Sequence, residues 1–195
     1  PEVCIYFDAH LYRGNRTTKY NAENFRAFRS ANFPVLADVG IHIKFNPNNI
    51  LLPDSFTAPL KVSVNLDTRV AVLRIFPGIT PEVMDAVLGM EGLRGVVLET
   101  FGSGNAPTAE WFVERIKKAV RRVLLVLNVT QCQAGKVDMD AYATGIALKN
   151  EGVISGYDST IEAAITKMFY ILGQTDDLHK AKELLNSNLR GEISI

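Results

Sequence analysis

The sequence predicts an α/β protein in which an antiparallel strand hairpin precedes a small parallel sheet with helices on both faces. Three observations support this fold class. Short β-branched and aromatic runs open the chain, strand-like apolar runs alternate with amphipathic helical segments from residue 67 onward, and the links between them are short. Such alternation favours right-handed crossovers within one parallel sheet.

The first 66 residues predict strands and turns but no long helix. Residues 3–7 are β-branched and aromatic, and the segment after them suggests a hairpin that runs into a turn at Asn15 and Arg16. Residues 21–43 contain aromatic side chains without helical spacing, and Pro34 limits any helix there. Turn-forming residues without periodicity then mark a linker over 44–66.

The remaining residues predict four strands and four helices. Strands are expected at 70–76, 95–101, 123–129 and, in short form, 152–156. Thr80 as N-cap and Pro81 start one helix, a second helix carries Trp111, Phe112, Ile116 and Val120 on one face, the capping box Ser159-x-x-Glu162 opens a helix over 161–172, and a last amphipathic helix is expected over 175–189.

Composition excludes several classes of function. Lys plus Arg equals Asp plus Glu at 21 each in 195 residues, so no net charge attracts the chain to nucleic acid or to an anionic membrane. The longest apolar run is far short of a membrane span, and no signal peptide is visible. Two cysteines without a disulfide framework favour a reducing cytoplasm, and three isolated histidines argue against a metal site.

Several candidate ligand-binding residues also have ordinary structural explanations. The glycines of Gly102-Ser103-Gly104-Asn105 could admit a phosphate or carboxylate, but Pro107 breaks a dinucleotide fingerprint and a tight turn explains them equally well. Cys132 follows a strand with no histidine nearby, which favours packing over nucleophilic catalysis. Lys19, after Arg13 and Arg16, is by default a solvated lysine in a basic turn.

Ordered motifs along the chain nevertheless resemble the cytoplasmic, type I L-asparaginase family. They are Arg13-Gly14-Asn15-Arg16-Thr17-Thr18-Lys19, the run from Glu99 to Pro107, Thr130-Gln131-Cys132, Tyr142-Ala143-Thr144-Gly145, Gly152 to Asp158, Glu162 to Lys167, and Asn188-Leu189-Arg190-Gly191-Glu192. Because the motifs keep their order from Cys4 to Glu192, the resemblance covers nearly all of this chain.

The resemblance implies a division of the chain into three parts. Residues 1–43 would be the C-terminal remnant of a larger N-terminal α/β domain, 44–66 the linker, and 67–195 the smaller C-terminal domain. The family's nucleophilic threonine, in a Thr-Gly-Gly-Thr-Ile type motif, and its Thr-Asp-Thr motif do not occur here. We therefore expect a fragment that is inactive alone and needs the missing N-terminal segment of the same protein.

The implied activity is cofactor-free hydrolysis of the side-chain amide of L-asparagine to L-aspartate and ammonia, through a threonine acyl-enzyme. Lys19 would be the family's catalytic lysine, and Gly104 and Asn105 would contact substrate in a neighbouring subunit of a homodimer or homotetramer. Thr18, Thr130 and Cys132 match positions of an allosteric site, although Glu99 replaces an arginine there and cannot pair with an effector's carboxylate. The alternative is a non-enzymatic α/β module that binds a small amino acid or nucleotide.

Overall fold

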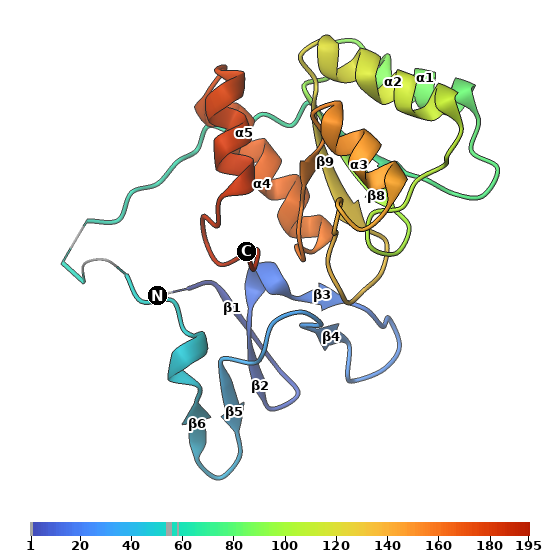
Figure 1. Ribbon diagram of the computed structural model, residues 1–195. Coiled ribbons are helices and arrows are strands. Elements are labelled where there is room, and N and C mark those ends of the chain that lie inside the picture. The colour runs from blue at the N-terminus through green and yellow to red at the C-terminus, as the bar shows by residue number, and fades with distance from the viewer. Residues whose placement is uncertain (1, 54–55, 58) are drawn as a thin grey trace.

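The computed structural model describes residues 2–53, 56–57 and 59–195 and contains two principal sheets (Figure 1). An antiparallel sheet in the N-terminal part has the strand order β1-β2-β5-β6, and a parallel sheet in the C-terminal part has the order β10-β9-β8-β7. A short strand pair, β3 and β4, lies between them (Figure 1). The mixed α/β fold class expected from the sequence is confirmed.

The N-terminal sheet is built on the predicted hairpin. Strands β1 (Cys4–Phe7) and β2 (His10–Arg13) pair antiparallel and are joined by the two-residue turn Asp8-Ala9, whose φ angles of 47° and 60° give the backbone twist that a tight hairpin requires. β5 (Ala37–Val39) pairs with β2, and β6 (Ile43–Phe45) pairs with β5. β6 was not predicted, and it reaches two residues into the expected linker.

The short pair β3 (Thr18–Lys19) and β4 (Phe28–Arg29) follows the 3-10 turn η1 (Gly14–Arg16). A second 3-10 turn, η2 (Pro47–Asn49), begins the segment expected to be a linker. Of that segment, residues 54–55 and 58 lie outside the described residues. From residue 50 to residue 69, the described residues contain no helix or strand.

The parallel sheet consists of β7 (Val70–Arg74), β8 (Gly95–Thr100), β9 (Leu125–Thr130) and β10 (Ile154–Ser155). Alternate residues of β8 point to opposite faces, so Val96 and Leu98 belong to one hydrophobic core and Val97 to another. The first core includes side chains of α1 (Pro81–Leu88), α2 (Glu110–Arg121) and α3 (Ala143–Asn150). The second includes α4 (Ile161–Gln174) and α5 (Leu178–Asn186). Helices therefore cover both faces, as predicted.

Three details of the C-terminal part differ from the sequence-based prediction. Helix α3 was not predicted. The third strand begins at Leu125 rather than Val123, because Val123 has a φ of 73° and is 55% exposed in the turn after α2. The helix expected over 175–189 is limited to α5, whose N-cap is Asp177.

The capping box assigned to Ser159 and Glu162 was also wrong by one residue. Thr160 is the N-cap of α4, and its side chain accepts a hydrogen bond from the backbone N–H of Ala163. The buried hydroxyl of Ser159 has no hydrogen-bond partner within the described part of the chain.

The chain's C-terminal end lies beside η1 (Figure 1). Within the residues described, no helix is long and apolar enough to cross a bilayer.

Candidate functional site

A pocket lies where the carboxyl ends of the parallel strands meet the segment around β3. It has a volume of about 270 Å³. We call it the strand-end pocket, and its lining includes Arg16, Thr18, Tyr20, Arg29, Arg74, Glu99, Thr130, Gln131, Cys132, Asp158 and Thr160. Loops and helix N-termini converge at this edge of a parallel sheet, so the pocket occupies the position where ligands gather in α/β folds.

Glu99, near the end of β8, places a carboxylate in this pocket. Burial raises the pKa of Glu99 above its ordinary value; the guanidinium of Arg74, 3.7 Å from the carboxylate, opposes the shift, and the carboxylate of Glu162 adds to it. A second buried carboxylate, that of Asp158, is neutralised by Arg16. Glu99 cannot itself pair with a ligand's carboxylate, whereas the guanidinium groups of Arg29 and Arg74 also line the pocket.

Arg16 and Asp158 join the N-terminal segment to the entrance of α4. The guanidinium is 2% exposed and donates two hydrogen bonds to the carboxylate, at 2.9 and 2.6 Å. Burial alone would raise the pKa of Asp158, but these bonds and the backbone N–H of Ser194 hold it below its ordinary value. The pair fixes η1, and with it the following strand β3, against the C-terminal sheet.

The side chains of residues 18–20 alternate between the strand-end pocket and the outside of the pocket. Thr18 and Tyr20 line the strand-end pocket, whereas Lys19 does not line it. Thr18 donates a hydrogen bond to the carboxylate of Glu162 at 3.1 Å. The ammonium of Lys19 is exposed, and no carboxylate within the described residues pairs with it.

Thr130 and Cys132 form a small turn at the end of β9. The hydroxyl of Thr130 donates to the backbone carbonyl of Gly102 and accepts from the backbone N–H of Cys132, at 2.5 and 3.0 Å. Cys132 is exposed at the pocket. The sequence-based expectation that this cysteine packs in the interior was therefore wrong, because the strand ends two residues before it and the chain has already reached the surface.

Gly104 and Asn105 lie in the tight turn after β8 and do not line the strand-end pocket. Backbone hydrogen bonds close the turn between Phe101 and Asn105. Gly104 has a φ of 115°, and a Cβ there would lie 3.1 Å from a methyl group of Val137. A tight turn thus accounts for this glycine, and Asn105 is half-buried beside it.

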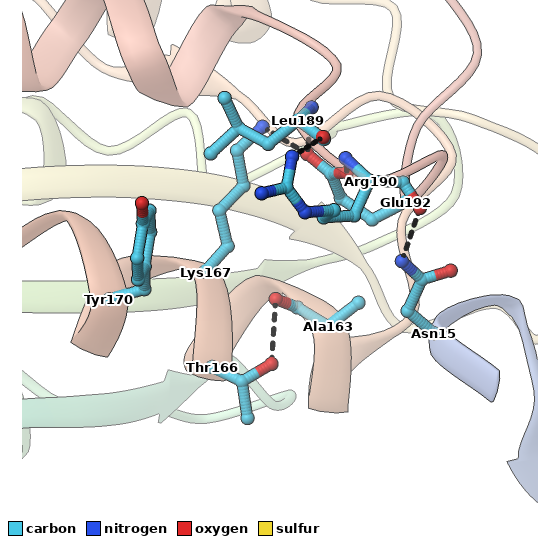
Figure 2. Close-up of a pocket in the computed structure, with 8 residues that line it drawn as sticks. All are labelled: Asn15, Ala163, Thr166, Lys167, Tyr170, Leu189, Arg190 and Glu192. Atoms are coloured by element: carbon cyan, nitrogen blue, oxygen red, sulfur yellow. Dashed lines mark hydrogen bonds and ion pairs between the residues drawn. The ribbon is translucent and has the colours of Figure 1, made fainter. Parts of the chain in front are cut away.

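A second pocket lies along α4 and also has a volume of about 270 Å³ (Figure 2). We call it the α4 pocket. It is lined by Asn15, Ala163, Thr166, Lys167, Tyr170, Leu189, Arg190 and Glu192. No local sequence pattern predicts this pocket, since its walls come from η1, α4 and the C-terminal tail, residues 187–195.

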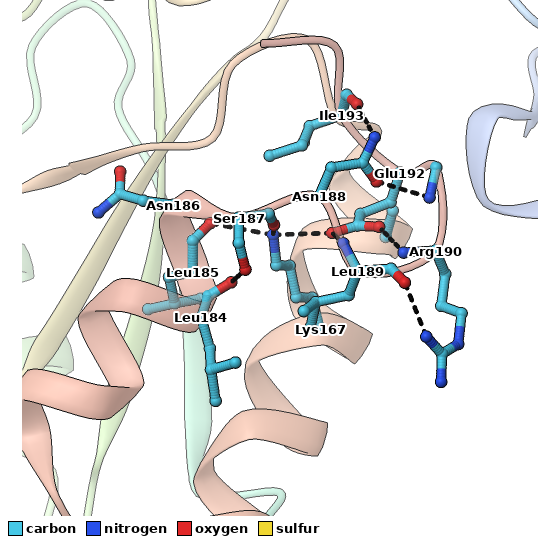
Figure 3. Close-up of polar contacts among 12 residues, drawn as sticks. Lys167, Leu184, Leu185, Asn186, Ser187, Asn188, Leu189, Arg190, Glu192 and Ile193 are labelled. Atoms are coloured by element: carbon cyan, nitrogen blue, oxygen red, sulfur yellow. Dashed lines mark hydrogen bonds and ion pairs between the residues drawn. The ribbon is translucent and has the colours of Figure 1, made fainter. Parts of the chain in front are cut away.

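A buried ion pair forms the back of the α4 pocket (Figure 3). The Lys167 ammonium lies 2.7 Å from the Glu192 carboxylate and donates to the backbone carbonyls of Leu185 and Ser187. Burial lowers the pKa of Lys167, and Glu192 opposes this shift. Burial would raise the pKa of Glu192, but Lys167 and the backbone N–H groups of Leu189 and Arg190 hold it below its ordinary value.

No three His, Cys, Asp or Glu side chains gather in a metal-binding arrangement among the residues that the structure describes.

Comparison with known proteins places this arrangement in a family. Residues 69–185 match the family profile described as the glutaminase/asparaginase C-terminal domain, and residues 1–51 match the N-terminal asparaginase profile. The chain is 40% identical over 193 residues to L-asparaginase 1 of Escherichia coli strain K12. The aligned region covers 99% of this chain and 56% of the relative. The crystal structure of L-asparaginase I from Vibrio cholerae superposes with a TM-score of 0.91 at 40% identity. The chain belongs to the type I asparaginase family.

Other members of this asparaginase family have different names. The human protein named 60 kDa lysophospholipase is 44% identical over 195 residues, which is all of this chain and 34% of that relative. The Vibrio cholerae structure is likewise covered over 58% of its chain. This chain thus spans between about a third and just over half of the relatives it matches.

Sequence reasoning found the strand-end loops of this asparaginase-family chain but missed the residues that complete the pocket. Arg16 and Asp158 are 142 positions apart, and no local pattern links them. An acidic residue following a predicted strand end, as Asp158 does, was the one available signal.

Proposed function

We propose that this chain forms part of a cytoplasmic L-asparaginase that hydrolyses the side-chain amide of L-asparagine to L-aspartate and ammonia. The observation that carries the proposal is Lys19, an exposed lysine without an acidic partner among the described residues, which lies within the stretch 1–51 that matches the N-terminal asparaginase profile. We assign Lys19 the catalytic role, because an unpaired ammonium next to an otherwise well-anchored segment is available to a reacting group.

The threonine nucleophile and the aspartate that would pair with Lys19 come, in this proposal, from an N-terminal segment outside the present sequence. Attack by a threonine hydroxyl on the amide carbon releases ammonia and leaves an acyl-enzyme that water then hydrolyses. Lys19, together with the aspartate, orients and helps activate the hydroxyl. The larger size of the relatives supports this division of labour.

The test is reconstitution of activity. The chain would be joined to an asparaginase N-terminal segment that bears the Thr-Gly-Gly-Thr-Ile and Thr-Asp-Thr motifs, and ammonia release from L-asparagine would be measured. Lys19→Met should lower turnover by about 10²- to 10⁴-fold with unchanged folding. Lys44→Met, at another exposed lysine without an ion pair in the described part of the chain, is the matched control and should retain activity. Near-normal turnover of Lys19→Met would remove Lys19 from the mechanism.

The substrate is part of the proposal, because a relative as similar as 44% identical is named as a lysophospholipase. A substrate panel of L-asparagine, L-glutamine and a lysophospholipid would separate the two chemistries. Release of fatty acid without release of ammonia would overturn the asparaginase assignment while leaving the family unchanged.

We further propose a homodimer or a dimer of dimers in which the Gly104-Asn105 turn faces the active site of a neighbouring subunit. The half-buried Asn105 amide, held by the closed turn, is suited to a fixed polar contact. Analytical ultracentrifugation of the reconstituted protein should show a dimer or tetramer, and Asn105→Ala should raise KM more than it lowers kcat. A monomeric active enzyme would contradict this assembly.

The strand-end pocket supports a second candidate function, non-enzymatic binding of a small ligand, since this chain alone supplies its walls. Thr18, Thr130 and Cys132 would be its contacts, and Glu99 would disfavour an effector that binds through a carboxylate. Calorimetric titration of the chain alone with amino acids and nucleotides tests this candidate. Saturable binding that Thr130→Val abolishes, without ammonia release, would favour it.

A further inference from the structure

The α4 pocket joins three segments that are far apart in the sequence. Asn15 comes from η1, Ala163, Thr166, Lys167 and Tyr170 come from α4, and Leu189, Arg190 and Glu192 come from the C-terminal tail (Figure 2). Its lining is mostly apolar: the Tyr170 ring, the Leu189 and Ala163 side chains, and the aliphatic part of Lys167. Such a lining favours a ligand with a hydrocarbon body.

The buried ion pair at the back of this pocket is not available to a ligand, because its hydrogen-bonding groups are already paired within the protein. The Lys167 ammonium has three N–H donors, and its three acceptors are the Glu192 carboxylate and the carbonyls of Leu185 and Ser187. Glu192 in turn accepts from Lys167 and from two backbone N–H groups. Both charges are therefore satisfied within the protein.

Arg190 is the charged group left for a ligand. Its guanidinium reaches from the tail toward α4 in Figure 2. It donates one hydrogen bond, to the backbone carbonyl of Leu189, and pairs with no carboxylate among the described residues. A guanidinium has five N–H donors, so one edge remains open for a two-point contact with a carboxylate.

We propose that the α4 pocket binds an amphipathic monocarboxylate, a linear aliphatic acid whose carboxylate pairs with Arg190 and whose chain lies on Tyr170, Leu189 and Ala163. An aliphatic amine is disfavoured because the free charge at the pocket is positive. The neutral alcohol of equal length gains the apolar contacts but not the ion pair. The site does not depend on hydrolysis and goes beyond the proposed asparaginase activity.

Isothermal titration calorimetry of the 195-residue chain tests the proposal, with octanoate, octanol and octylamine below their micelle concentrations. Octanoate should bind at one site, at least about tenfold more tightly than octanol, and octylamine should not bind. From butanoate to octanoate, each methylene that the pocket buries should raise the affinity by about fourfold. A ligand that contacts all three segments should also raise the unfolding temperature.

Two variants test the contributions of the ligand's carboxylate and of its aliphatic part separately. Arg190→Met keeps an unbranched side chain but removes the charge, so octanoate binding should fall to the level of octanol binding while octanol is unaffected. Thr166→Trp, at an exposed position on α4, should fill the pocket and abolish binding of both. Arg121→Met is the matched control, since Arg121 is exposed on α2 and does not line the pocket.

Each outcome decides the proposal. Absence of octanoate binding, equal binding of octanoate by wild type and Arg190→Met, or undiminished binding by Thr166→Trp would overturn it. Because Arg190 and Thr166 are exposed, both variants should fold, and an unchanged unfolding temperature without ligand verifies this.

Discussion

The guanidinium of Arg16 holds the carboxylate of Asp158 through two hydrogen bonds, although the residues are 142 positions apart in the sequence. The same guanidinium also donates to the carbonyls of Asn32 and Glu192 and to the Ser194 hydroxyl. This one side chain therefore connects the N-terminal segment, the start of α4 and the C-terminal tail.

Removing Arg16 should cost far more stability than removing an exposed cation. Arg16→Met leaves Asp158 buried and unpaired, so the free energy of unfolding should fall by about 3–5 kcal/mol in urea titrations. Lys149→Met, which breaks the exposed Lys149–Asp140 pair, should cost less than about 1 kcal/mol. An equal decrease in the free energy of unfolding in the two variants would show that the buried Arg16–Asp158 pair stabilises the fold no more than an exposed pair does.

Acid should weaken the fold through Asp158 and Glu192. Both carboxyl groups have folded-state pKa values below their ordinary values of 3.8 and 4.5. Their stabilising contribution is therefore complete above the unfolded values and is lost as the pH falls through the lowered ones. The urea concentration at the unfolding midpoint should decrease when the pH is lowered below about 4.5. Asp158→Asn should flatten part of that fall, and a curve parallel to wild type would contradict the assignment.

Glu99 should have the opposite pH dependence. Burial raises the pKa of Glu99 in the folded protein, with Arg74 opposing and Glu162 adding to the shift. Ionised Glu99 therefore costs stability at neutral pH, and the cost disappears as the pH falls below the unfolded value. Glu99→Gln should stabilise the chain by about 1 kcal/mol at pH 7 and by nothing at pH 4. Glu114→Gln, at an exposed position on α2, should change stability at neither pH.

Gly104→Ala should be more destabilising than Gly78→Ala, although both glycines have positive φ angles of 115° and 86°. At Gly78 a Cβ meets no atom within 4 Å, so only backbone strain of about 1 kcal/mol is expected. At Gly104 the contact with Val137 adds a packing cost, for a total of about 3 kcal/mol. Thermal unfolding of the two variants measures the difference, and equal shifts would mean that Val137 moves aside freely.

The parallel sheet was predictable because its signal is local. The apolar runs of β8 and β9 and the helical spacing of Phe112 and Ile116 depend only on nearby residues, and these side chains are buried as expected. The Val123 prediction failed because a β-branched residue that favours strands occupies a left-handed turn, where tertiary context overrides propensity.

Helix α3 could not be predicted because its own sequence barely favours a helix. It contains Gly145, and a Cβ there would lie 2.7 Å from the backbone carbonyl of Met139. Packing of Leu148 into the core, rather than intrinsic propensity, stabilises this helix. The α4 pocket could not be predicted for a similar reason, since its walls come from segments that only the folded chain brings together.

The hydrogen bonds between residues 13–16 and the C-terminal tail have an evolutionary consequence. Arg13, Asn15 and Arg16 donate to the backbone carbonyls of Gly191, Arg190 and Glu192, respectively. Every amino acid carries that carbonyl, so a substitution on the tail side at Arg190 keeps its acceptor, and no compensating change in Asn15 is required. Correlated substitutions at these positions should therefore be rare among related sequences. Covariation would then give little sign of this contact, even though it joins the N-terminal segment to the C-terminal tail.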